Sequence, residues 1–229
     1  MTTRTSPPAA GPATPARDRR WAALGVIALA QLMVALDATI VNVALPTAQA
    51  DLGFDDAHRS YVVTAYTLSF AGLLLLGGKA SDRLGRRRVL TAGLTGFAAA
   101  SALAGAATSF ELLVLGRALQ GASAAFTAPA ALALIAATFT EPRERGKAFG
   151  VFGAVASSGA VVGLLLGGLL TEYAGWRWCL YVNVAVAVAV VAAGRRVLPA
   201  DRGYPVPVDV VSGILATAGL AGLVLGASE

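Results

Sequence analysis

Residues 21–50 read WAALGVIALAQLMVALDATIVNVALPTAQA, an apolar stretch in which Asp37 is the only ionisable side chain. The stretch is long enough for a helix that crosses a bilayer, which needs about 20 mostly apolar residues. It is too long for a cleaved signal peptide, and no polar mature chain follows it. A charge inside the membrane is costly unless it faces the bundle interior or a water-filled cavity and has a partner. The stretch therefore predicts a membrane protein in which another group compensates Asp37.

The composition of the whole chain also indicates a membrane protein. It is 56% hydrophobic and only 14% charged, with a mean hydropathy of +0.69, whereas soluble domains are about 25% charged. The net charge of +5 does not indicate nucleic acid, because the basic residues form short clusters between apolar runs without interleaved aromatics. One cysteine and one histidine, with no nucleophile–base constellation or phosphate-binding glycine loop, argue against an enzyme, a metal site or a bound cofactor.

The chain divides into apolar runs that are each long enough to span a bilayer as a helix. These runs are residues 21–44, 61–78, 88–108, 111–137, 147–171, 177–194 and 208–226. They are too long and continuous for the strands of a membrane barrel, so they predict an all-α transmembrane fold. We expect a disordered cytoplasmic tail at 1–20, a six-helix domain at 21–194, a cytoplasmic linker at 195–207 and a seventh transmembrane helix within 208–229.

The basic residues alternate between the two sides of these predicted spans. Of the 18 lysines and arginines, all but three fall on one side; Arg59 and Arg177 lie on the other, and Arg117 lies inside a span. Because basic residues are enriched in cytoplasmic loops, this pattern predicts a multi-pass protein of the cell membrane with a cytoplasmic N-terminus. The lipid bilayer is its first partner.

Arg117 is the group we expect to compensate Asp37. By helical rise, both residues lie about 10 Å below the outer surface, so we expect them to face one cavity and to interact directly or through water. Burial favours the protonated carboxyl and the guanidinium favours the charged form, and this balance suits a group that loads and releases protons. A static ion pair that only fixes helix packing is the alternative. Gln31, Asn42 and Gln120 could line the same cavity or join helices by hydrogen bonds.

Residues 77–90, GGKASDRLGRRRVL, form a short basic link between the second and third runs. Gly78 and Gly85 permit close approach and a tight turn, and Asp82 can cap the next helix or pair with its arginines. The spacing resembles the loop signature of the major facilitator superfamily, which lies between helices two and three. That resemblance implies a conformational latch that contacts the other half of a transporter. The residues that carry it are Gly78, Asp82, Arg83, Gly85, Arg86 and Arg87.

Three further motifs occur in the same order and helices as in the fourteen-helix drug:proton antiporter branch of that family. LDATIVNVALP (36–46) resembles its first-helix motif, GRALQGASAAF (116–126) the fourth-helix motif, and WRWCLYVNV (176–184) the start of the sixth helix. The resemblance implies inverted three-helix repeats and proton coupling through Arg117. It also implies a small-molecule substrate, with the proton gradient as the energy source instead of a cofactor.

The fifth run matches the antiporter pattern incompletely. Its glycines are present, but Leu164 stands where the family has proline. A stripe of small residues at four-residue spacing predicts close helix packing in lipid, so a packing seam without a coupling role is an alternative. The substitution also leaves open a facilitator or symporter of the same fold. The matching glycines are Gly159, Gly163, Gly167 and Gly168.

Transporters of this type bind substrate between two six-helix halves, and this chain supplies one half, a linker and one more span. We therefore expect the N-terminal half of a proton-coupled efflux transporter for drugs or other small molecules. On this reading the chain is a fragment or truncated product, and the missing C-terminal half is its partner. A half-transporter completed by a second chain and a non-transporting remnant are the alternatives.

Overall fold

The structure, a computed structural model, describes residues 14–199, 201 and 203. This part of the chain is helical and contains no strand, which confirms the predicted all-α fold. The predicted seventh helix at 208–226 lies outside the described residues, as do residues 200, 202 and 204–207 of the predicted linker, whereas residues 195–197 belong to the last helix. The helices are α1 (Thr14–Leu52), α2 (Asp56–Leu84), α3 (Arg86–Gly105), α4 (Phe110–Thr138), α5 (Pro142–Tyr173) and α6 (Arg177–Val197).

The helices continue beyond the apolar runs that predicted them. α1 begins at Thr14 and ends at Leu52, so residues 14–20 are helical and were wrongly assigned to a disordered tail. The first connection, expected at 45–60, is reduced to 53–55. An apolar run marks only the part of a helix that lies in hydrocarbon. The helix continues through its polar ends because this supplies hydrogen bonds to the backbone N–H and C=O groups there.

Short caps define where the helices begin. Before α5, the Glu141 side chain accepts hydrogen bonds from the backbone N–H groups of Arg143 and Glu144, and Pro142 occupies the first turn. These hydrogen bonds hold the pKa of the Glu141 carboxyl below its usual value. Asp55 and Ser109 cap α2 and α4 in the same way, as expected for short polar residues at this position.

Five of the six described helices are long and apolar enough to cross a membrane: α1, α2, α4, α5 and α6. α3 is not among them, because its 20 residues begin with three arginines and include many small residues. It packs instead between α4 and α6, with Leu90, Leu94 and Phe97 buried. The position of α3 therefore depends more on packing against neighbouring helices than on its own hydropathy.

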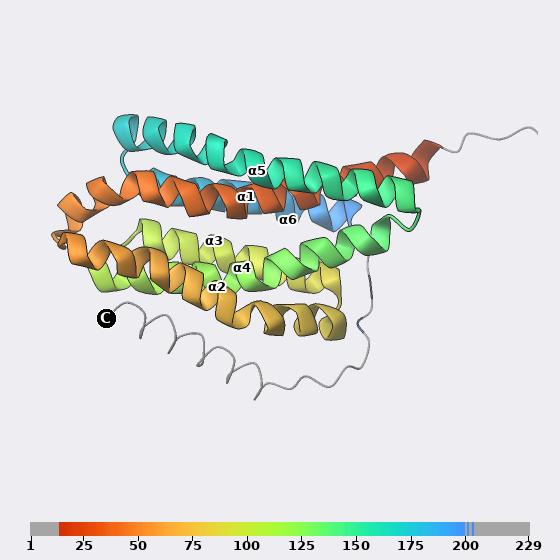
Figure 1. The fold of residues 1–229 in the computed structure, drawn as a ribbon, viewed down its shortest axis with the longest axis horizontal. Coiled ribbons are helices and arrows are strands. Elements are labelled where there is room, and N and C mark those ends of the chain that lie inside the picture. The colour runs from red at the N-terminus through yellow and green to blue at the C-terminus, as the bar shows by residue number, and fades with distance from the viewer. Residues whose placement is uncertain (1–13, 200, 202, 204–229) are drawn as a thin grey trace, which may run out of the picture.

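The helices form two groups, with α1, α5 and α6 in one and α2, α3 and α4 in the other (Figure 1). α5 and α6 pack along α1, while α2 and α3 pack along α4. The first helix of the first three, α1, thus packs with two helices of the second three, and the first helix of the second three, α4, packs with two helices of the first three. Internal repeats produce this reciprocal packing. Contacts between α1 and α4 and between α3 and α6 join the two groups.

Glycines bring the helices of each group into close contact. A Cβ at Gly77 would lie 2.1 Å from the Ala125 carbonyl oxygen, and one at Gly121 would lie 2.1 Å from the Tyr66 carbonyl oxygen. The α2–α4 seam therefore excludes side chains at both positions. Such close backbone approach is how helices associate in lipid, where the hydrophobic effect does not drive helices together.

Candidate functional site

Asp37 on α1 and Arg117 on α4 form a direct salt bridge. The Arg117 Nη1 donates to Asp37 Oδ2 at 2.5 Å, and the two side chains are 0% and 2% exposed. The structure thus brings together the two charges that the sequence predicted would interact. α1 continues to Leu52, so Asp37 lies about 22 Å from that end of the helix.

Two amide side chains complete the surroundings of Asp37. Gln120 accepts from Arg117 Nη1 through Oε1 at 2.8 Å, and its Nε2 donates to Asp37 Oδ1 at 3.0 Å and to Ser101 Oγ at 2.7 Å. Asn183 Nδ2 donates to Asp37 Oδ1 at 2.7 Å. The carboxylate therefore has hydrogen-bond donors on both oxygens. The network joins α1, α3, α4 and α6.

Tyr66 on α2 covers the positive side of the pair. The Arg117 guanidinium carbon lies 4.4 Å from the centre of the Tyr66 ring, a cation–π contact that gains strength when water is excluded. We expected the pair to line a cavity that water or substrate can enter. In this conformation that expectation is wrong, because Tyr66 and the buried amides enclose both charges.

Two polar atoms inside this network have no partner among the described residues, Arg117 Nε and Asn183 Oδ1. Buried polar groups are satisfied in the great majority of cases, and each exception has a cost and calls for an explanation. The unused acceptor on Asn183 belongs to a residue that already contacts Asp37. The site therefore contains an unused acceptor on a residue that contacts Asp37, and a carboxyl group needs an acceptor after gaining a proton.

The other two cavity candidates are not part of this network. Asn42 is exposed and donates to the Ala38 carbonyl oxygen at 2.9 Å, and Gln31 is half-buried. They are eleven positions apart, which is about three helical turns, so they share one face of α1. Asp37 points from a different face of the same helix.

Three of the four glycines predicted on α5 contact α1. A Cβ at Gly159 would lie 2.6 Å from Ala35 Cβ, one at Gly163 would lie 1.9 Å from Thr39 Oγ1, and one at Gly167 would lie 3.1 Å from Ile40 Cγ1. Gly168 differs, because a Cβ there has open space. The α1–α5 seam therefore depends on a stripe of three glycines, and it positions the helix that carries Asp37.

The predicted latch loop is shorter than its sequence suggested. Gly85 alone separates α2 from α3 and has φ of +94°, a conformation that favours glycine. We had considered Asp82 as the cap of α3, but it does not cap this helix. Asp201, from the segment after α6, accepts from the backbone N–H groups of Arg86 at 2.9 Å and Arg87 at 3.2 Å. Asp82 lies in the last turn of α2, whereas Asp201 approaches the open N-terminus of α3.

The last turn of α6 and the segment after it lie directly against this loop. Arg87 Nη2 donates to the Arg195 carbonyl oxygen at 2.8 Å, and a Cβ at Gly203 would lie 1.9 Å from the Arg83 carbonyl oxygen. Asp82 and Arg83 themselves are exposed. The loop is therefore held to the end of α6 and the segment after it on one side, while the side chains of Asp82 and Arg83 are left uncovered by the described residues.

Gly78 does not make the close contact that we expected of it. A Cβ at Gly78 has open space, whereas its neighbour Gly77 meets the backbone of α4. Successive residues on a helix point about 100° apart, so only one of the two adjacent glycines can face α4. Gly78 belongs instead to the uncovered surface that includes Asp82.

The sequence reasoning missed Ser101, Asn183 and Tyr66 in the buried network and Asp201 at the loop. Asn183 could have been identified, because it is an uncharged polar residue inside a predicted span, like Gln31 and Asn42. Ser101 and Tyr66 are common residue types in membrane helices and have no distinguishing local pattern. Asp201 lies in a polar linker, where a carboxylate is unremarkable until the fold places it at a helix end.

Comparisons with known proteins identify the family. The sequence pattern of the Major Facilitator Superfamily matches residues 27–227. The chain is 57% identical over 213 residues to the puromycin resistance protein of Streptomyces alboniger, covering 92% of this chain and 42% of that protein. It is 43% identical over 210 residues to the cephamycin export protein of Amycolatopsis lactamdurans, covering 90% of this chain and 43% of that protein.

A third relative, the tetracenomycin C resistance and export protein of Streptomyces glaucescens, is 36% identical over 209 residues, covering 91% of this chain and 39% of that protein. The chain thus spans less than half the length of the curated relatives it matches. This family is one of membrane transporters and not of enzymes, in agreement with the sequence prediction. Because the family pattern matches residues 27–227, which is most of the chain and includes part or all of each described helix, the chain belongs to the Major Facilitator Superfamily.

Proposed function

We propose that this chain forms the N-terminal half of a proton-coupled transporter that exports drugs or other small molecules. The observation that carries the proposal is the buried salt bridge between Asp37 and Arg117, surrounded by amides from α4 and α6. Ionisable groups inside a membrane are expensive to maintain and commonly serve proton or substrate pathways. The relatives named for antibiotic resistance and export support a drug-like substrate.

Protonation of Asp37 would change the contacts between α1 and α4. A proton on Oδ1, the oxygen that Asn183 contacts, removes the negative charge that holds Arg117 Nη1, so the ion pair becomes a weaker contact of a cation with a neutral acid. The energy of a buried ion pair depends on both partners being charged. Loading a proton would therefore bias the relative positions of the two helices, and releasing it would restore the present arrangement.

Asn183 is suited to serve both protonation states. In the present state its Nδ2 donates to the Asp37 carboxylate, and its Oδ1 is unused. Rotation of the amide by about 180° exchanges the donor for the acceptor, so the same residue can accept from the protonated acid. Asn183 would then lower the cost of either state without carrying a charge.

Access of the proton to Asp37 requires a change in the packing around the site. Tyr66 covers Arg117, and α2 carries this residue into contact with α4 at Gly121. α2 also leads directly into the latch loop, where Asp82 and Arg83 are uncovered. We propose that contacts of this loop with the other half of the transporter control the position of α2, and through it the access to Asp37.

Substrate would bind between the two halves and not at the buried pair. Gln31 and Asn42 lie on a face of α1 away from Asp37, and Asn42 is exposed. An exposed amide such as Asn42 on a spanning helix suits a polar cavity better than lipid, because placing polar groups in hydrocarbon is costly. We propose that this face of α1 forms part of the substrate cavity when the C-terminal half is present.

The proposed location is the cell membrane, with the N-terminus in the cytoplasm. The starts of α1, α3 and α5 and the ends of α2, α4 and α6 meet at one end of the bundle, and most basic residues gather there. Positive loops remain on the cytoplasmic side during insertion. This orientation places the latch loop in the cytoplasm.

A chimera tests the proposal. Residues 21–199 would replace the matching segment of the puromycin resistance protein of Streptomyces alboniger, and puromycin uptake would be measured in inside-out vesicles with an imposed proton gradient. We expect gradient-driven uptake from the chimera and its loss in the Asp37→Asn variant. Asp56→Asn, at an exposed carboxylate on α2, is the matched control and should keep the uptake.

Each other result would contradict part of the proposal. A chimera that is inserted in the membrane but inactive means that this half does not support export of that kind. Gradient-driven uptake that survives Asp37→Asn removes Asp37 from proton coupling, although the export function would stand.

Leu164 supports a second candidate function, a facilitator of the same fold. It occupies the position of the antiporter proline in the fifth helix and is 61% exposed on α5. Without proline, α5 keeps a complete hydrogen-bond ladder and lacks the bend that proline imposes. A facilitator would move substrate at equal rates with and without the proton gradient, so the same vesicles distinguish the two functions.

A further inference from the structure

An apolar groove runs along the outer surface between α3 and α6. It has a volume of about 310 Å³, and its walls include Leu94 and Ala98 from α3 and Val188 and Val191 from α6. Val188 is 61% exposed, so the groove is open at the side of the helix pair. Arg195, near the end of α6, also lines it.

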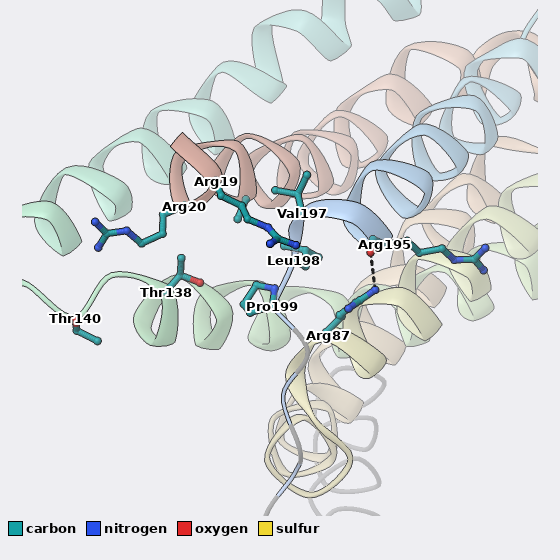
Figure 2. A pocket seen from close by; sticks show the side chains of 10 residues that line it. Arg19, Arg20, Arg87, Thr138, Thr140, Arg195, Val197, Leu198 and Pro199 are labelled. Carbon is teal, nitrogen blue, oxygen red and sulfur yellow. Dashed lines mark hydrogen bonds between the residues drawn. The ribbon is translucent and has the colours of Figure 1, made fainter. Parts of the chain in front are cut away.

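A second, larger hollow lies next to the end of this groove. It has a volume of about 980 Å³ and is lined by four arginines: Arg19, Arg20, Arg87 and Arg195. Figure 2 shows the side chains of Arg19 and Arg87 ending near this hollow, while Arg195 extends away from it. Arg195 therefore lies between the basic hollow and the apolar groove and lines both.

Few anionic groups of the described chain neutralise these arginines. Arg20 pairs with Glu144 at 3.1 Å, whereas Arg19 and Arg87 donate to backbone carbonyls. Among the described residues the guanidinium of Arg195 has neither a hydrogen bond nor a salt bridge, and only its carbonyl accepts one. The positive charges of these arginines repel one another. An anion placed at Arg195 would reduce that repulsion and would be attracted by the other arginines as well.

We propose that this region binds an anionic phospholipid, with one acyl chain along the α3–α6 groove and the headgroup phosphate at Arg195. The arrangement matches the ligand in order: an apolar surface for the chain, then a free guanidinium, then further positive charge. Guanidinium groups bind phosphate with charge-assisted hydrogen bonds, and basic pockets between membrane helices bind acidic headgroups. The inference requires that the chain is embedded in a membrane, but it does not depend on proton-coupled transport.

A soluble phosphate has the same chemistry at Arg195 but leaves the groove empty. Burial of apolar surface by the acyl chain provides the part of the binding that distinguishes a lipid from a free anion. A zwitterionic lipid fills the groove equally well, but its own cation opposes the field of the neighbouring arginines. The site should therefore require both the chain and the net negative charge.

The test is native mass spectrometry of the 229-residue chain in detergent micelles that contain phosphatidylglycerol and phosphatidylcholine in equal amounts. We expect phosphatidylglycerol to be retained preferentially. Arg195→Gln should lower its apparent affinity about fivefold, the effect of one basic residue near an anionic lipid. Arg145→Gln, at an exposed arginine outside both cavities, should leave the affinity unchanged.

A second pair of variants tests the groove. Val188→Trp fills it and should reduce phosphatidylglycerol retention, while Val161→Trp, at an equally exposed valine on α5, should not. Glycerol 1-phosphate at millimolar concentration should fail to displace the lipid. Equal retention of both lipids, equal effects of the two arginine variants or of the two tryptophan variants, or displacement by glycerol 1-phosphate would each overturn the proposal.

Discussion

Asp37 accepts hydrogen bonds from Arg117, Gln120 and Asn183, and only Arg117 neutralises its charge. Removing either charged partner of a buried pair leaves the other as an uncompensated charge, which costs about 3–5 kcal/mol. Removing both charges avoids this penalty. A variant that lacks one charge of the pair should therefore be less stable than a variant that lacks both.

Arg117→Met tests this difference in the detergent-solubilised chain. We expect the single variant to lose about 3–5 kcal/mol of stability because Asp37 remains buried and charged. The double variant Asp37→Asn with Arg117→Met should recover most of that loss, because an amide at position 37 can still bond to Gln120 and Asn183. The measurement is the shift of the thermal unfolding midpoint. Additive losses in the double variant would mean that the two side chains do not act as a pair.

At the scale of the helices, close packing depends on which glycine faces a neighbour. Gly163 and Gly168 are both on α5 and both match the family pattern. A Cβ at Gly168 would meet open space. A Cβ at Gly163 would lie 1.9 Å from Thr39 Oγ1 and 2.9 Å from the Leu36 carbonyl oxygen. The first of these contacts can be relieved by a side-chain rotation, whereas the second involves backbone. The α1–α5 seam must therefore widen if residue 163 carries a Cβ.

Gly163→Ala and Gly168→Ala form a matched pair of variants for this seam. We expect Gly163→Ala to destabilise the chain by about 1–3 kcal/mol, the usual cost of overpacking. Gly168→Ala should be neutral or slightly stabilising, because alanine is the better helix former where space allows. Thermal unfolding of the two purified variants provides the comparison. Equal midpoints would show that α1 and α5 are not held by this contact.

The N-terminus of α3 depends on a residue far away in sequence. Asp201 accepts from the backbone N–H groups of Arg86 and Arg87, and loss of a cap costs about 1 kcal/mol. Asp201→Ala should therefore raise local amide exchange in residues 86–90 about fivefold, measured by hydrogen–deuterium exchange and mass spectrometry. Asp82→Ala is the control and should leave this exchange unchanged. The reverse result would mean that Asp82 is the cap.

The existence and order of the six described helices could be predicted, since each contains a long apolar run. Their ends could not be predicted equally well. α1 extends through Pro46 to Leu52, and α2 and α3 are separated only by Gly85. Hydropathy records where a helix meets hydrocarbon and gives no signal for a helix that continues into polar surroundings.

At the scale of the whole molecule, the antiparallel order of the helices collects the basic segments at one end. Residues 83–88, 143–147 and 195–196 are far apart in sequence and come from the ends of different helices at that side of the bundle (Figure 1). The opposite end carries Asp51, Asp55 and Glu111. This separation of charge is the physical basis for the proposed orientation.

Single cysteines at the two ends test the orientation in intact cells. Cys179 is buried, and a Cys179→Ser background would carry either Ala57→Cys or Gly146→Cys, both at exposed positions. We expect a membrane-impermeant maleimide to label the first from outside and the second only after the cells are opened. Labelling of Gly146→Cys in intact cells would reverse the proposed orientation and place the latch loop outside.

Two conclusions needed no knowledge of the fold: this protein consists of membrane-spanning helices, and Asp37 and Arg117 compensate one another. Both conclusions follow from the solvent, because hydrocarbon requires long apolar helices and does not tolerate a lone charge. The tertiary structure alone decided that Tyr66, Ser101 and Asn183 enclose the pair, that Gly163 packs where Gly168 does not, and that Asp201 caps α3. A helix that is apolar on all sides carries little information about its rotation or its neighbours, so these contacts exist only once the helices are packed.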